Sequence, residues 1–502
     1  MFLGIDCGTQ GTKALVMEAN GAVLGRGYRK HALIERSTGA REQEPSWWVE
    51  ALRSSVKEAL EASGRSDVLA LGVSGQQHGM VLLDESKQVI RPAKLWNDTE
   101  TAPQNEAILR RFGGKQAFGK RFGIVPLTGY TVSKLLWVKE NEPENFARIR
   151  HILLPHEYLN FWLTGQMRAE PGDASGTGYF NPVRREWQFE VLDAIDQGVG
   201  ILSAALPALV HADDCVGEVL PEVAADLGLP RSCLVSAGGG DNMMGAIGTG
   251  NVREGVVTLS LGTSSTVYSY SETPVQDPSG TVAPFCSSSG GWLPLVCTMN
   301  ATNVVTATAT LLGKSVEEID GALTRIPPGA DGLVFLPFLN GERTPDLPTA
   351  QGAILGITSN NFTPDHLLRA AVEGVSFGIL NGLDRILQGR EATVVQAIGG
   401  GARSRGWRQL LADATGATIQ APMEEESGCL GAAIQAVVAW AKADGNPLSF
   451  AEVAARAAQI REDATCVPRP ELSIPYKNAR AAYQRHLEAL YPEARQDVPP
   501  SA

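Results

Sequence analysis

The sequence contains no pair of cysteines spaced as Cys-x-x-Cys, and no paired-histidine motif. Its seven cysteines stand at positions 7, 215, 233, 286, 297, 429 and 466. This distribution disfavours a structural zinc site, and the odd count argues against a disulfide framework. A reducing cytoplasm therefore fits the cysteine content best.

Long apolar runs and blocks of basic residues are also missing. No apolar stretch approaches the roughly 20 residues that cross a bilayer. Residues 1–6 enter a strand pattern at once, without the basic region of a signal peptide. The 43 Lys and Arg stand against 55 Asp and Glu, so the net charge is −12. Such a chain is a poor candidate for nucleic acid or an anionic membrane, and local groups must hold any anionic ligand.

Two common nucleotide-binding motifs are absent. Gly313-Lys314-Ser315 matches the end of a P-loop, but Thr308 stands where the first glycine of that motif belongs. No Gly-x-Gly-x-x-Gly follows a predicted strand, which disfavours a Rossmann dehydrogenase.

The patterns that are present indicate an α/β fold. The 502 residues exceed one ordinary core, and roughly 100–200 residues per domain predict two or more domains. Strands are expected at 2–5, 14–17, 68–73, 80–83, 334–338 and 394–398. Helices are expected from Pro45 onward and at 366–387, 403–415, 428–443 and 475–490. The tail after Pro492 is expected to be disordered.

The second half of the chain echoes the first. Residues 255–266 form a strand, a Gly-Thr loop and a second strand, as residues 3–12 do. This repeat suggests two duplicated α/β domains with a cleft between them and a boundary near 245–255. We assign residues 1–248 to the first domain, 249–490 to the second and 491–502 to a tail.

The first candidate site is the loop after the opening strand. Asp6 ends that strand, and Gly8, Thr9, Thr12 and Lys13 follow. Backbone N–H groups and hydroxyls in such a turn suit phosphate oxygens, and Asp6 could sit beside a phosphate-bound Mg²⁺. The alternative is a plain hairpin with a turn-capping Asp.

Two glycine-rich loops follow later in the chain. In Gly238-Gly239-Gly240-Asp241-Asn242, Asp241 is well placed to accept a hydroxyl proton as that oxygen attacks a phosphorus. A flexible linker with an N-cap Asp is the alternative. Residues 399–404 end a strand and open a helix, which suits a flat ring or phosphates, or is simply a tight turn.

Polar side chains in loops after apolar strands could recognise the hydroxyls of a sugar. They are Gln77 and His78, and Trp96 with its neighbours 95–98. The alternatives are a structural histidine and a core tryptophan. The run 424–426 is most simply a solvated face or loop. Residues 341–345 could form a functional loop, but an internal pair of Glu342 and Arg343 is the simpler interpretation.

Together these pieces resemble the FGGY family of carbohydrate kinases over nearly the whole chain. The first family signature is recognisable at 129–141, and the second at 352–357 continuing through 366–373. The Asp-x-Gly-Thr loop at 6–9 and the Gly-Gly-Asp-Asn loop at 239–242 occur in the family order.

The resemblance implies two ribonuclease H-like, actin-like ATPase domains that close on ATP and a sugar. It implies that Asp241 is the catalytic base and that Asp6 is an essential carboxylate, with both near Mg²⁺. Substrate contacts are assigned to Gln77, His78, Trp96, Asp241 and Asn242. Nucleotide contacts are assigned to Gly8, Thr9, Thr12, Lys13, Gly262, Thr263, Gly400, Gly401, Ala402 and Arg405.

Within the family, the closest likeness is to the members that phosphorylate D-xylulose to D-xylulose 5-phosphate. Gln77 is a departure, because a Met-His pair is typical there. A family kinase acting on ribulose, L-xylulose or xylitol, and a non-catalytic sugar or nucleotide sensor, are the alternatives. An ATPase that moves a protein partner is a third. Relatives suggest a homodimer.

Overall fold

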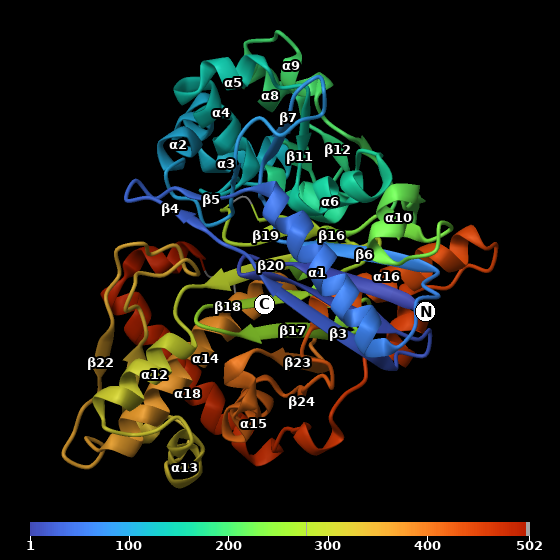
Figure 1. Cartoon of the computed structure of the whole chain (residues 1–502). Coiled ribbons are helices and arrows are strands. Elements are labelled where there is room, and N and C mark those ends of the chain that lie inside the picture. Colours follow the sequence, from blue (N-terminus) through green and yellow to red (C-terminus); the bar gives the residue numbers. More distant parts are fainter. Residues whose placement is uncertain (278, 498–502) are drawn as a thin grey trace.

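The computed structural model describes residues 1–277 and 279–497 and contains two large mixed β-sheets (Figure 1). The strand order of the first sheet is β14-β15-β6-β1-β2-β3. β1, β2 and β3 form an antiparallel meander, and β6 and β15 add on in parallel. These strands span Phe2–Cys7 (β1), Gly11–Met17 (β2), Val23–Lys30 (β3), Ala70–Gly75 (β6), Cys215–Glu218 (β14) and Leu234–Ser236 (β15).

The second sheet repeats this pattern in the order β19-β20-β18-β17-β23-β24. β17, β18 and β20 form the antiparallel meander, and β23 and β24 are the added parallel strands. The predicted duplication into two ribonuclease H-like units is therefore confirmed. The strands span Val256–Leu261 (β17), Ser265–Ser269 (β18), Ala283–Cys286 (β19), Trp292–Thr298 (β20), Val394–Ile398 (β23) and Thr418–Gln420 (β24).

A mostly helical insertion covers one end of the first sheet, at the top of Figure 1. Its own apolar core includes Phe118, Phe122, Leu135 and Tyr179. The helices span Ala102–Arg111 (α2), Lys115–Phe122 (α3), Thr131–Asn141 (α4), Pro143–Ala147 (α5), Pro155–Thr164 (α6), Pro171–Ala174 (α7), Phe189–Asp196 (α8) and Ile201–Ala204 (α9).

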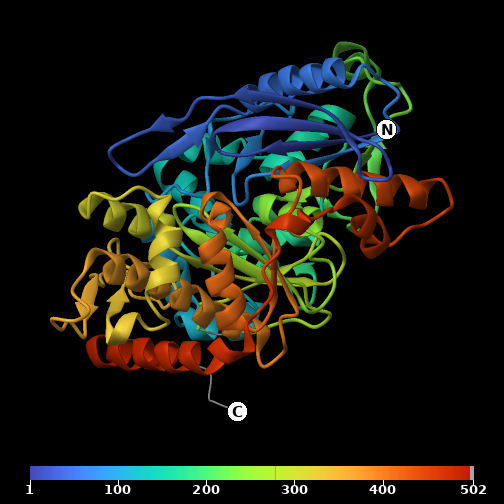
Figure 2. The same ribbon diagram turned by 90° about the horizontal axis from the view of Figure 1, so that it is seen from below.

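The remaining helices flank the two sheets. α1 covers the outer face of the first sheet, and α18 runs along the opposite end of the molecule (Figure 2). These helices span Pro45–Ser63 (α1), Pro221–Leu227 (α10), Asp241–Gly248 (α11), Thr302–Leu311 (α12), Glu318–Arg325 (α13), Pro364–Leu387 (α14), Arg405–Thr415 (α15), Ser427–Ala443 (α16), Phe450–Ala457 (α17) and Ser473–Leu490 (α18).

Short strands complete the fold and mostly order the loops. They span Ile34–Glu35 (β4), Arg41–Gln43 (β5), Val81–Leu83 (β7), Ala93–Lys94 (β8), His151–Leu153 (β9), Arg168–Ala169 (β10), Phe180–Asn181 (β11), Glu186–Trp187 (β12), Ala208–Leu209 (β13), Gly239–Gly240 (β16), Val334–Leu336 (β21) and Ala353–Leu355 (β22).

The strands and helices expected from the sequence are present, with ends that differ by a few residues. The expected disorder after Pro492 is wrong for residues 493–497, which belong to a 3₁₀ helix over Pro492–Asp497. Ala494 of this helix is buried in the same apolar cluster as Tyr483 and Leu487 of α18. Residues 498–502 lie outside the described residues. Within the described part of the chain, no helix is both long and apolar enough to span a membrane.

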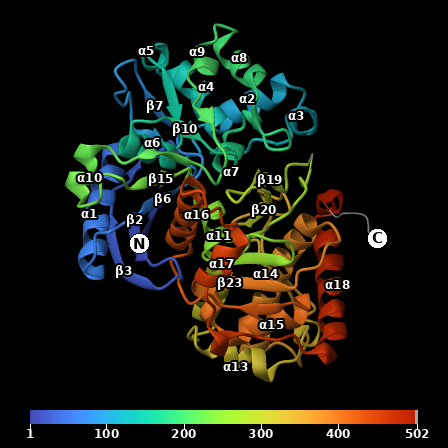
Figure 3. The ribbon, with the colours of Figure 1, turned by 90° about the vertical axis from the view of Figure 1, so that its right-hand side faces the viewer.

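Helix α16 belongs to the second half of the sequence but packs on the first sheet. It lies against β1 and β6 on one side and against α11 on the other (Figure 3). A Cβ placed on Gly4 of β1 would lie 1.8 Å from the carbonyl oxygen of Cys429, and one on Gly431 would lie 1.8 Å from that of Met244. This backbone-to-backbone packing therefore requires glycine, and it joins the two halves of the chain.

The Gly431→Ala variant tests this packing. We expect it to lose about 1–3 kcal/mol of unfolding free energy, because α11 and α16 must move apart to admit the methyl group. Urea unfolding followed by circular dichroism measures the loss. Gly321→Ala on α13 is the matched control, since its Cβ would meet only the end of the Arg325 side chain. Equal unfolding midpoints for Gly431→Ala and the unmodified protein would contradict the tight packing.

Candidate active site

The loop between β1 and β2 holds the first group of predicted site residues. Asp6 is partly buried at the end of β1 and accepts a hydrogen bond from Ser74 Oγ at 2.6 Å. The N–H of Gly8 donates to the carbonyl of Gly11 at 3.1 Å, which closes the turn. Burial raises the pKa of Asp6, although the Ser74 bond opposes this.

Thr9 connects this loop to the predicted sugar-binding loop. Its Oγ1 donates to Gln76 Oε1 at 3.1 Å and accepts from Trp96 Nε1 at 2.9 Å. Trp96 is 46% exposed, so the alternative of a core tryptophan is wrong for this residue. The structure thus brings two loops together that lie about 70 residues apart in the sequence.

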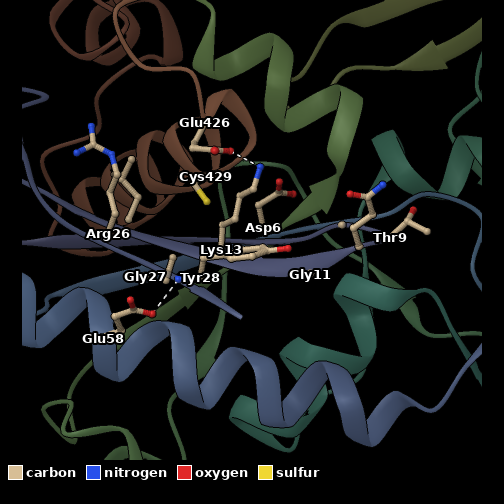
Figure 4. Close-up of a pocket in the computed structure, with 14 residues that line it drawn as sticks. Asp6, Thr9, Gly11, Lys13, Arg26, Gly27, Tyr28, Glu58, Glu426 and Cys429 are labelled. Carbon is tan, nitrogen blue, oxygen red and sulfur yellow. Dashed lines mark hydrogen bonds and ion pairs between the residues drawn. The ribbon is translucent and has the colours of Figure 1, made fainter. Parts of the chain in front are cut away.

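A groove of about 680 Å³ opens beside Asp6, Gly8 and Thr9 (Figure 4). Lys13 lines it and forms an ion pair with Glu426, which precedes α16. Thr12 is buried in β2. Lys13 is therefore not a free cation in this structure, since Glu426 offsets its charge.

Asp241 stands at the first position of α11, after the short strand β16. Its Oδ1 accepts from the N–H of Asn242 at 2.8 Å, and Asn242 Nδ2 donates to Gln77 Oε1 at 2.9 Å. Burial, and next the negative charge of Asp6, raise the pKa of Asp241 to about 7. A carboxyl with a pKa near neutrality is suited to accept a proton from a hydroxyl.

His78 lies beside Gln77 in a left-handed backbone conformation, with φ of 65°. Its ring stacks on Tyr130 with centroids 4.4 Å apart. Burial, and next the positive charges of Lys134 and Arg343, lower the pKa of His78 to about 3. The imidazole is therefore neutral near pH 7, which suits hydrogen bonding to a sugar and not anion binding.

The nucleotide contacts predicted in the second half of the chain lie just after β17 and β23. Thr302 Oγ1 donates to the carbonyl of Gly262 at 2.7 Å, and the N–H of Ala301 donates to that of Thr263 at 3.2 Å. A Cβ on Gly401 would lie 2.9 Å from Leu261 Cβ. The segment Gly400–Ala402 thus lies against the Gly262-Thr263 loop, and Arg405 is exposed at the start of α15.

Asp6 and Asp241 could hold a divalent cation together with phosphate oxygens. Mg²⁺ is commonly held by one or two carboxylates, with water and substrate phosphates as its other ligands. Within residues 1–277 and 279–497, no group of three or more His, Cys, Asp or Glu is arranged to hold a metal ion. The charge of Asp6 raises the pKa of Asp241, so a cation near both would offset their repulsion.

Sequence reasoning missed a buried pair behind Asp241. His156 Nδ1 and Asp173 Oδ2 lie 2.6 Å apart, and both side chains are fully buried. A Cβ on Gly240 would lie 3.1 Å from Asp173 Oδ1, and the charge of Asp173 also raises the pKa of Asp241. No local pattern marks this pair, because its two residues lie on different helices.

Two expectations about charged residues are corrected, one of them only in part. The run 424–426 is a loop with Glu425 exposed, as expected, but Glu424 is not solvated, since it is 9% exposed and pairs with Arg26. Glu342 does not pair with the Arg343 guanidinium. Its carboxylate instead accepts from the N–H groups of Met299 and Arg343 and from Asn300 Nδ2.

Comparison with known proteins identifies the family. Residues 1–248 match the N-terminal domain model of the FGGY family of carbohydrate kinases, and residues 257–440 match its C-terminal domain model. The chain belongs to this family. The order of its Asp6 and Asp241 loops along the chain agrees with the family resemblance seen in the sequence.

The most similar relatives include xylulose kinases. The chain is 45% identical to xylulose kinase of Haemophilus influenzae over 98% of this chain and 100% of that protein. Solved xylulose kinases from Brucella ovis and Bifidobacterium adolescentis superpose with TM-scores of 0.89 and 0.83, at 30% and 33% identity. They cover 98% and 97% of this FGGY chain, and in both cases 99% of the solved chain is covered.

The raised pKa of Asp241 predicts a pH-dependent stability. An Asp carboxyl titrates near 3.8 in the unfolded chain and at about 7 in this fold. The folded state therefore binds the proton more tightly than the unfolded chain does. This proton binding stabilises the fold fully below about pH 3.8, and the stabilisation is lost as the pH rises through about 7. Asp241→Asn should be more stable than the unmodified protein at pH 8, by on the order of 2–4 kcal/mol, and the advantage should shrink by pH 5.

Unfolding by urea at the two pH values measures this difference. Asp196→Asn is the control, since Asp196 is also a buried carboxylate but caps Gly198 and Leu202 away from this site. An Asp241→Asn variant that is equally stabilised at pH 5 and pH 8 would contradict the raised pKa.

Proposed function

We propose that this FGGY kinase phosphorylates D-xylulose at its terminal O5 with ATP, giving D-xylulose 5-phosphate and ADP. The observation that carries the proposal is the 45% identity to a xylulose kinase over essentially the full length of both chains. The site supports it, because a carboxyl of raised pKa stands beside hydrogen-bonding side chains and a Gly-Thr loop.

Asp241 is the proposed general base. It accepts the O5 proton as O5 attacks the γ-phosphorus in line, so an O–P bond forms while the bond to the ADP oxygen breaks. Gln77 holds Asn242 beside Asp241, and His78 presents a neutral imidazole to the sugar. Trp96 and Asn242 complete the proposed sugar contacts.

The phosphate side of the site is built from backbone groups and small side chains. Gly8, Thr9, Thr12 and Lys13 would face the phosphates from the first domain, and Gly262 and Thr263 from the second. Gly400, Gly401, Ala402 and Arg405 would lie along the nucleoside. Mg²⁺, held by Asp6 and Asp241 directly or through water, would supply positive charge to the transferring phosphoryl group.

Coupled ADP release with Mg-ATP and a substrate panel tests the proposal. The panel is D-xylulose, D-ribulose, L-xylulose, L-ribulose, xylitol and glycerol. We expect the highest kcat/KM for D-xylulose. A higher value for another sugar would move the specificity, with Gln77 the first residue to exchange. ADP release without sugar would indicate an ATPase, and none at all from folded protein would favour a sensor.

The base assignment has its own test. Asp241→Asn should lower kcat by about 10²–10⁴-fold, the range for loss of a positioned general base. In the unmodified enzyme, kcat/KM should rise with pH up to about 7 as the Asp241 carboxyl loses its proton. Near-normal turnover by a folded Asp241→Asn variant would show that another group is the base.

A further inference from the structure

Arg343 is an exposed arginine on the loop that follows β21, in the second half of the chain. Within residues 1–277 and 279–497, its guanidinium forms no ion pair with any Asp or Glu. An unpaired guanidinium is available to an anionic ligand.

The loop that carries Arg343 is held in place on both sides of that residue. Glu342 is 3% exposed and its carboxylate accepts from Met299 N at 2.7 Å and Asn300 Nδ2 at 3.0 Å. Thr344 is also buried, and its Oγ1 donates to the carbonyl of Cys297 at 2.7 Å. Arg343 is therefore presented by a fixed backbone attached to β20.

That attachment brings Arg343 to the sugar side of the candidate site. Cys297 packs against an apolar cluster that includes Tyr130 and Met243. Met243 follows Asp241 by two residues. The positive charge of Arg343 reaches His78 and Tyr130, whose rings are stacked, and contributes to the low pKa of His78. Arg343, in the second domain, thus lies on the side of the site where His78 of the first domain is proposed to contact the sugar.

Three other cations in or next to the candidate site are already engaged. Lys13 is paired with Glu426, and Arg403 with Glu425. Lys134 is fully buried, donates to the carbonyl of His78, and has its pKa lowered to about 7 by burial. Arg343 has no ion pair within the described residues, and a guanidinium can bind phosphate oxygens through two parallel hydrogen bonds.

We propose that Arg343 binds the phosphoryl group on the sugar side of the transfer, and holds the phosphate of the sugar phosphate product. This inference rests on the proposed sugar kinase function. Such a contact would distinguish the product from the neutral sugar, because only the product offers a dianionic phosphate to the guanidinium. D-xylulose itself needs no such cation.

Binding measured by calorimetry without nucleotide tests the inference. Arg343→Gln should weaken the binding of D-xylulose 5-phosphate by about 10-fold or more, as expected for the loss of charge-assisted hydrogen bonds. Binding of D-xylulose should stay within about twofold. Arg343→Lys should restore part of the product affinity, since it keeps the charge without the planar fork.

Arg110→Gln, an exposed arginine on α2, is the control and should leave both affinities unchanged. Equal affinity of Arg343→Gln and the unmodified protein for D-xylulose 5-phosphate would overturn the role of Arg343 and leave the kinase function standing. An equal loss for D-xylulose and its phosphate would also overturn it, since that would indicate damage to the sugar site. Unmodified protein that binds neither compound would overturn the proposed function, and the role of Arg343 with it.

Discussion

The close packing of α16 against β1 and α11 is the constraint on which the rest of the structure depends. Side chains of ordinary size cannot fit at Gly4 and Gly431, where a Cβ would overlap a carbonyl oxygen of the neighbouring element. A Cβ at Gly428, in the first turn of α16, would lie 2.9 Å from the Asp6 carboxyl carbon. The same helix therefore fixes the Asp6 loop of the first half beside the chain of the second half. Asp241 begins the helix that packs on its other side.

Electrostatic repulsion is concentrated where the proposed chemistry occurs. Burial, and next the negative charges of Asp6 and Asp173, raise the pKa of Asp241. Such an arrangement costs folding free energy, and it gives a carboxyl that binds protons well near pH 7. The cations nearby are mostly neutralised by protein groups, so phosphates and their metal ion would find a site with few fixed positive charges.

The local sequence was sufficient to locate the candidate site residues that stand at the ends of strands. Asp6 after β1 and Gly262-Thr263 after β17 were visible as a carboxylate or Gly-Thr loop following an apolar run. Asp241 was visible through the three glycines before it. Their predicted roles remain proposals, but their gathering into two neighbouring groups follows from the duplicated sheet topology. The pair of His156 and Asp173 had no such signal, because a buried histidine looks the same in sequence whatever it contacts.

The sequence by itself determined the α/β class, the duplication and the places where chemistry-bearing loops begin. These depend on the alternation of apolar residues and on turn-forming glycines, which are properties of neighbouring residues. Only the tertiary structure decided which charges are paired. Lys13 pairs with Glu426, which lies 413 positions away, and the buried Glu424 pairs with the exposed Arg26. Among the described residues, Arg343 pairs with no carboxylate. Burial and charge pairing depend on residues that are distant in the chain, so no local pattern could have predicted them.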